Sequence, residues 1–150
     1  MNLLTAKKVF FLLTAIALIA QYGCQKLIET KNMVTDFATT IRSTERVTKL
    51  VSEKKDIVDF TEEEAKELIQ YGKLALENAQ KIDFELLNRL YPELGDKFED
   101  ELISGVNLIV KGYEEKNKVM IQEGKSLIEK WGNWFEENIE NIKPLSFLKK

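Results

Sequence analysis

TEEEAKELIQYGKLALENAQKI, residues 61–82, opens on a strong helix start. The Thr61 hydroxyl is placed to accept a hydrogen bond from the backbone N–H of Glu64, and the Glu64 carboxylate is placed to reach back to Thr61. The three consecutive glutamates also lie at the positive end of the helix dipole, where negative charge is favourable. The stretch therefore predicts a helix from about residue 61 to residue 81.

Small residues recur along this predicted helix at intervals of seven. They are Ala65, Gly72 and Ala79, and later in the chain Gly105 and Gly112 are also seven apart. A seam of small residues lets another helix backbone approach closely. We expect the two stripes to face each other in an antiparallel helix pair. The alternative is that these glycines occupy surface positions of little consequence.

Apolar residues at spacings of three and four extend the helical pattern to both sides. Between Leu27 and Val51 they predict a helix over about 26–54. After the central helix, Asp83 is a suitable N-cap for a short helix over 84–90, which Pro92 brings to an end.

A second long apolar pattern starts near Asp96, lapses between Glu114 and Lys118, and resumes as far as Ile142, before Pro144. One helix of about 45 residues across the gap would be roughly 68 Å long. The helix over 61–81 is only about half that length and could not cover so long an apolar stripe. We therefore expect a bend in the gap that divides the pattern into two helices.

These patterns predict an all-α protein. The main part, residues 24–150, is expected to be one domain, an up-and-down bundle of about four helices with a short extra helix. Residues 1–23 are expected to form a signal or anchor helix that precedes it.

The N-terminal residues have the outline of an export signal. Lys7 and Lys8 precede an apolar run over residues 9–20, and Gly23 precedes Cys24. A bilayer span needs about 20 apolar residues, so a run of this length is typical of a cleaved signal peptide. The alternative is an uncleaved anchor over residues 3–23, with the N-terminus held in the cytoplasm by the two lysines.

This segment resembles a bacterial lipoprotein precursor, in which a small residue comes directly before a lipidated cysteine. Gly23 and Cys24 carry the resemblance, which covers residues 1–24. It implies a diacylglycerol on the sulfur of Cys24, which becomes the mature N-terminus. It also implies a membrane-anchored protein of the cell envelope, with the bulk of the chain outside the cytoplasm. The alternative is a free thiol at the end of a membrane helix. Since Cys24 is the only cysteine, the chain cannot form an intramolecular disulfide.

The composition excludes several kinds of chemistry. The chain has 22 basic and 25 acidic residues and no histidine. Its acidic balance does not fit a nucleic-acid partner. The lack of histidine rules out Ser-His-Asp triads and most zinc sites. We expect neither an enzyme nor a metal or cofactor site, and we interpret the acidic cluster Asp96, Glu99, Asp100 and Glu101 as a solvated helix start.

An aromatic group near the end of the apolar pattern is the remaining candidate site. Trp131, Trp134 and Phe135 share one helix face. They either pack in the core at one end of the bundle, or bind a partner, or insert at a membrane interface.

Taken together, the sequence predicts a membrane-tethered envelope protein whose bundle is a non-catalytic module that binds another protein or itself. The alternatives are a single-pass membrane subunit of a larger complex and a bundle that binds a small apolar ligand.

Overall fold

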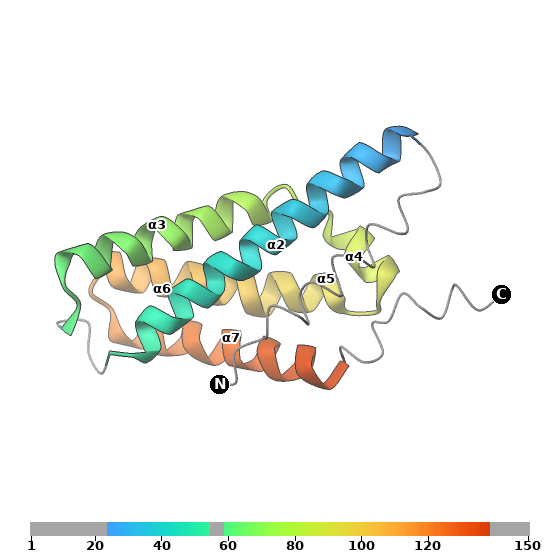
Figure 1. The fold of residues 1–150 in the computed structure, drawn as a ribbon. Coiled ribbons are helices and arrows are strands. Elements are labelled where there is room, and N and C mark those ends of the chain that lie inside the picture. Colours follow the sequence, from blue (N-terminus) through green and yellow to red (C-terminus); the bar gives the residue numbers. More distant parts are fainter. Residues whose placement is uncertain (1–23, 55–58, 139–150) are drawn as a thin grey trace.

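A computed structural model describes residues 24–54 and 59–138 of the chain (Figure 1). The predicted signal or anchor segment, residues 1–23, and the C-terminal residues 139–150 lie outside the described part. The helices are α2 (Cys24–Ser52), α3 (Glu62–Ala79), α4 (Phe84–Leu90), α5 (Leu94–Lys97), the π-helical segment η3 (Phe98–Ile103), α6 (Ser104–Glu114) and α7 (Lys118–Asn138).

The helices form the predicted up-and-down bundle. Helices α2 and α3 pack as an antiparallel pair, α3 lies against α6, and α6 packs antiparallel to α7 (Figure 1). Segments α5, η3 and α6 follow one another without a break and together make the third long helix of the bundle. The short helix α4 follows α3 in the chain and precedes the third long helix, and it has the bounds expected from the sequence. The all-α fold prediction is confirmed.

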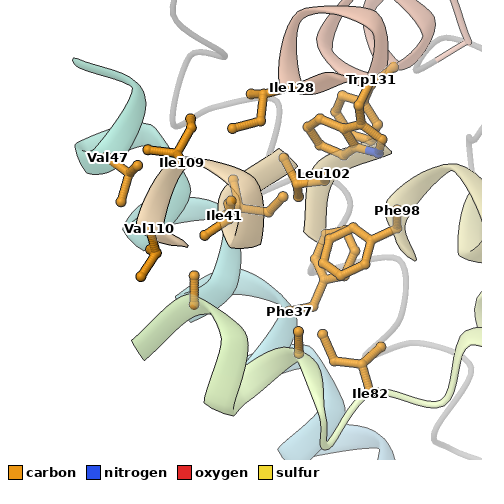
Figure 2. Packing of buried hydrophobic residues seen from close by; sticks show 14 of the residues in the cluster. Phe37, Ile41, Val47, Ile82, Phe98, Leu102, Ile109, Val110, Ile128 and Trp131 are labelled. Carbon is orange, nitrogen blue, oxygen red and sulfur yellow. The ribbon is translucent and has the colours of Figure 1, made fainter. Parts of the chain in front are cut away.

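One hydrophobic cluster joins the helices (Figure 2). The rings of Phe37 from α2 and Phe98 from η3 stack with their centroids 4.7 Å apart. On α7, the indole of Trp131 stacks on Phe135 with the centroids 4.9 Å apart. Trp131 also meets Phe98 edge-on at 6.1 Å. This chain of aromatic contacts connects α2, η3 and α7 through the middle of the bundle.

The start of α3 has the predicted capping box. The N–H of Glu64 donates to the Thr61 hydroxyl at 3.2 Å, and the N–H of Thr61 donates to the Glu64 carboxylate at 2.9 Å. The ammonium group of Lys54 reaches the same carboxylate at 2.8 Å. The hydrogen bond from Lys54, together with that from the backbone of Thr61, lowers the pKa of Glu64 from 4.5 to about 2.

This pKa shift predicts a loss of stability in acid. A carboxyl group whose pKa is lower in the folded state stabilises the fold above its unfolded pKa, and that contribution is lost as the pH falls. The loss should therefore occur between about pH 4.5 and pH 2. We expect Glu64→Gln to reduce the drop in melting temperature between pH 6 and pH 2.5. The neighbouring exposed Glu63→Gln serves as the control. Equal drops in both variants would contradict the assignment.

The expected bend divides α6 from α7. Lys116 has a positive φ of 55°, which ends the first helix. The side chain of Asn117 then accepts hydrogen bonds from the N–H groups of Val119 and Met120 at 3.1 and 3.3 Å. Asn117 thereby caps the start of α7, and the prediction of two helices in place of one is confirmed.

The π-helical segment η3 was not predicted, although the sequence contains a physical reason for it. Leu94, Phe98, Leu102 and Val106 are four residues apart, and all four are buried. In a regular α-helix of 3.6 residues per turn, each step of four rotates the side chain by about 40°, so the series would leave the core. The wider turns of a π-helix reduce this rotation. The segment therefore keeps all four side chains in the core.

The prediction that the two small-residue stripes face each other is wrong. Gly72 on α3 lies against the Val110 side chain of α6. Gly105 and Gly112, however, face α7, since a Cβ atom added at Gly105 would lie 2.8 Å from the carbonyl oxygen of Gly124. Helix α6 lies between α3 and α7 and presents a different side to each. The glycines of the two stripes therefore lie at two different helix contacts, Gly72 between α3 and α6 and the other two between α6 and α7.

The five small residues of the two stripes are nevertheless buried or partly buried in the bundle. Gly72, Gly105 and Gly112 are buried, Ala79 is 2 % exposed, and Ala65 is partly buried. The alternative that the glycines lie on the surface is therefore excluded.

Candidate functional site

A pocket of about 430 Å³ lies between α2 and α7. We call it the α2–α7 pocket. Helix α2 packs mainly on α3, while α7 packs on α6 and η3, so these two helices leave space between them. Its apolar wall is formed by Ile41, Leu102, Ile128 and Trp131. The charged residues that line it are Glu45, Lys49, Glu53, Lys125, Glu129 and Glu136.

Small residues on both helices explain why this space is not filled. Thr44 and Thr48 are buried positions of α2 that line the pocket, and each is smaller than Ile41, which lies one turn before Thr44 and two turns before Thr48. Their hydroxyls donate to the backbone carbonyls of Thr40 and Thr44, each at 2.9 Å, and are thus satisfied within the helix. On α7, a Cβ atom added at Gly132 would have no atom within 4 Å.

The open position at Gly132 predicts a stabilising substitution. Gly132→Ala should raise the free energy of unfolding by about 1 kcal/mol, because alanine is the better helix former and its methyl group meets no neighbour. Urea unfolding followed by circular dichroism measures the change. A loss of stability in this variant would show that the space beside Gly132 is occupied.

Glu45 is the unusual polar group of the pocket. One of its carboxylate oxygens, Oε1, is buried and has no hydrogen-bond partner. Burial raises the pKa of the Glu45 carboxyl, and the positive charge of Arg42 opposes this rise. A buried acceptor without a partner costs free energy, so this oxygen is poorly stabilised by the protein alone.

The two lysines of the pocket have other partners. The Lys125 ammonium group lies 3.5 Å from the carbonyl oxygen of Val51, and Lys49 lies 3.9 Å from Glu53 one turn further along α2. Within residues 24–54 and 59–138, Glu45 forms no ion pair. Four glutamates line the pocket against two lysines, so its charged part is acidic on balance.

The three aromatic residues singled out in the sequence differ in how deeply they are buried. Trp131 and Phe135 are each 1 % exposed and belong to the core. An exposed partner-binding or membrane-inserting role is thus not available to these two side chains in this structure. Trp134 is partly buried, and its ring meets Tyr91 edge-on at 6.1 Å. The buried Nε1 of Trp131 has no hydrogen-bond partner.

The acidic cluster at the start of the third long helix makes contacts within the protein. The Asp96 carboxylate accepts a hydrogen bond from Asn88 at 2.7 Å, and Glu101 pairs with Lys97 at 2.8 Å. This pairing raises the pKa of Lys97. In the described part of the chain, no group of three or more acidic or cysteine side chains is arranged to hold a metal ion.

Cys24, the predicted lipidation site, is the first residue of α2. None of the helices described, from residue 24 to residue 138, has the length and apolarity that a bilayer crossing requires. Comparisons of the chain with protein-family models, curated proteins and solved structures found no match.

Sequence reasoning missed Glu45, Thr44 and Thr48 as residues of a pocket. The signal was present in the pattern of α2, where two threonines occupy inward positions among larger apolar residues.

Proposed function

We propose that this protein is held on a membrane of the cell envelope through a lipid on Cys24, and that its helical bundle is a non-catalytic interaction or structural module. The observation that carries the proposal is the order of residues at the N-terminus. Lys7 and Lys8 are followed by the apolar run over 9–20 and then by Gly23 and Cys24.

The arrangement of the bundle is compatible with cleavage before Cys24. The described helices and the hydrophobic cluster all lie from Cys24 onward. Cleavage before Cys24 would therefore leave all the residues of these helices and of this cluster in the mature chain. Two or more acyl chains would then provide stable attachment, whereas a single chain binds a membrane only marginally.

The bundle is proposed to act by binding, because its residues favour no reaction. The whole chain lacks histidine, the commonest general acid and base at neutral pH. The partner is another protein or a second copy of this chain. Among the described residues, the large apolar side chains with substantial exposure are Leu74, 37 % exposed, and Val119, 65 % exposed.

Location is tested on the full chain expressed in a bacterial host. We expect the protein to remain with the membranes after an alkaline carbonate wash, which removes peripheral proteins. We also expect protease added outside the cytoplasmic membrane to digest the bundle. A protein that is recovered in the cytosol, or that is digested only after the cells are lysed, would contradict the proposal.

A further inference from the structure

We propose that residues 143–150 form a second membrane contact, which binds an anionic lipid surface beside the attachment at Cys24. The segment contains the bases Lys143, Lys149 and Lys150 and the large apolar residues Leu145, Phe147 and Leu148. It lies outside the described residues and follows α7, which is described as far as Asn138. The inference rests on the proposed attachment of the start of α2 to a membrane. It adds which end of the bundle faces that membrane and which residues contact it.

Helices α2 and α7 run in opposite directions through the bundle. The Lys125 ammonium group, in the first half of α7, lies 3.5 Å from the carbonyl oxygen of Val51, near the end of α2. Nearer the start of α2 and the end of α7, Phe37 and Trp131 both contact the ring of Phe98, with the centroids 4.7 and 6.1 Å apart. The start of α2 and the end of α7 therefore lie at the same end of the bundle (Figure 1). We call it the attached end, because it carries the proposed lipid.

The segment is long enough to reach a membrane at the attached end. At 1.5 Å per residue, α2 extends about 20 Å from Phe37 back to Cys24. Helix α7 extends about 10 Å from Trp131 to Asn138, so Cys24 lies roughly 10 Å beyond the end of α7 along the bundle. An extended chain spans about 3.3–3.6 Å per residue. The five residues from Asn138 to Lys143 can therefore cover about 17 Å, which brings all three lysines within reach of a surface at the level of Cys24.

The composition of the segment suits an anionic lipid surface. Negative headgroups attract lysine, and each lysine near the surface strengthens binding roughly fivefold. The three apolar side chains of the segment can enter the interface, as those of amphipathic anchors do. In the connection and short helix that follow α3, the exposed Lys81 and Arg89 lie 3.9 and 3.8 Å from Asp36 and Asp83. These two bases are engaged within the protein, so the proposal assigns the lipid contact to the lysines of the segment.

The described surface of the bundle offers the apolar residues of the segment little to pack on. Trp131 and Phe135 near the end of α7 are each 1 % exposed. Among the residues whose burial is described, the large apolar side chains with substantial exposure are Leu74 and Val119. Val119 lies at the start of α7, about 28 Å from Asn138. Leu74 is on α3, which packs on the far side of α6 from α7. Lipid is therefore favoured over the bundle as the surface that the segment contacts.

The experiment places the environment-sensitive fluorophore NBD on the segment of the full chain. Ser146→Cys introduces a thiol for the label, whereas a lipidated Cys24 takes up none. The protein is expressed in a bacterial host and reconstituted in nanodiscs of phosphatidylcholine, with or without phosphatidylglycerol. Nitroxide-labelled lipid quenches NBD that lies within the membrane. Glu115→Cys, in the exposed turn between α6 and α7, carries the matched control label at the opposite end of the bundle.

In nanodiscs that contain phosphatidylglycerol, we expect the label at position 146 to be quenched and its emission to shift to shorter wavelength. The label at position 115 should show neither change. Replacing one lysine of the segment by glutamine should lower the ratio of bound to free segment about fivefold, and replacing all three should lower it further. Replacement by arginine keeps the charge and should leave the quenching unchanged. Replacing the three apolar residues by serine should also remove the quenching.

Equal quenching at positions 146 and 115, or equal quenching with and without phosphatidylglycerol, would overturn the proposal. So would unaltered quenching in the variant with three glutamines. A shift in emission without quenching would show that the segment packs on protein, which also overturns it. The tether is read separately, because labelling of the wild type would show that Cys24 carries no lipid. The segment is then tested in a Cys24→Ala background, where an uncleaved anchor over residues 3–23 would hold the same end of the bundle at the membrane. A chain that leaves the nanodiscs in that background overturns both proposals.

Discussion

Trp131→Ala is expected to lower the free energy of unfolding by about 3–5 kcal/mol, the usual cost of removing a large aromatic side chain from a core. The indole is 1 % exposed. It lies against Phe98 of η3 and Phe135 of its own helix, so its removal breaks the aromatic contact that joins η3 to α7. The pocket beside it would also be enlarged, and the neighbouring side chains would not close the space completely.

Urea unfolding followed by circular dichroism measures this loss without relying on tryptophan fluorescence. Trp134→Ala is the matched control, since Trp134 is on the same helix but only partly buried. Its loss of stability should be clearly smaller. If the two variants lost the same free energy, or if Trp131→Ala cost less than about 1 kcal/mol, the position of Trp131 in the core would be wrong.

Gly124→Leu is expected to destabilise the protein by about 3 kcal/mol or more, or to prevent cooperative folding. Gly124 lies where α7 packs closely against α6. A Cβ atom added there would lie 2.5 Å from the carbonyl oxygen of Gly105 and 2.8 Å from Cγ1 of Ile109. Since one of these atoms belongs to the backbone, the two helices would have to move apart, and the core between them would open.

Gly132→Leu provides the control for this substitution in the same helix. It adds the same side chain where no atom lies within 4 Å of the added Cβ. It should leave the protein folded, with its melting temperature close to that of the wild type or above it. Similar destabilisation by leucine at both positions would show that the cost comes from the loss of glycine itself, and the proposed close approach of α6 and α7 would be contradicted.

Features that depend on a few neighbouring residues could be predicted from the sequence. The capping box at Thr61 and the short helix that Asp83 caps follow from side chains that reach their own backbone within three residues. The bend before α7 could be predicted because the apolar pattern lapses between Glu114 and Lys118. The cap that Asn117 provides at the start of α7 is also a local feature, but the lapse in the apolar pattern does not by itself identify it.

Features that depend on which helices become neighbours could not be predicted in the same way. Periodicity shows that Gly72 and Gly105 face inward, but a helix inside a bundle has more than one inward side. Gly105 faces α7, and only the packing of α6 between two helices determines this. The pocket is a further case, because the orphaned oxygen of Glu45 depends on where α7 lies relative to α2.

The attachment at Cys24 is the central claim, and intact-mass spectrometry tests it most directly. The full chain and its Cys24→Ala variant are expressed in a bacterial host and purified from the membrane fraction. The proposal predicts a mass equal to residues 24–150 plus acyl chains for the wild type, and loss of the acyl chains in the variant. An unmodified, full-length mass in both proteins would contradict it and would identify residues 3–23 as an uncleaved membrane anchor.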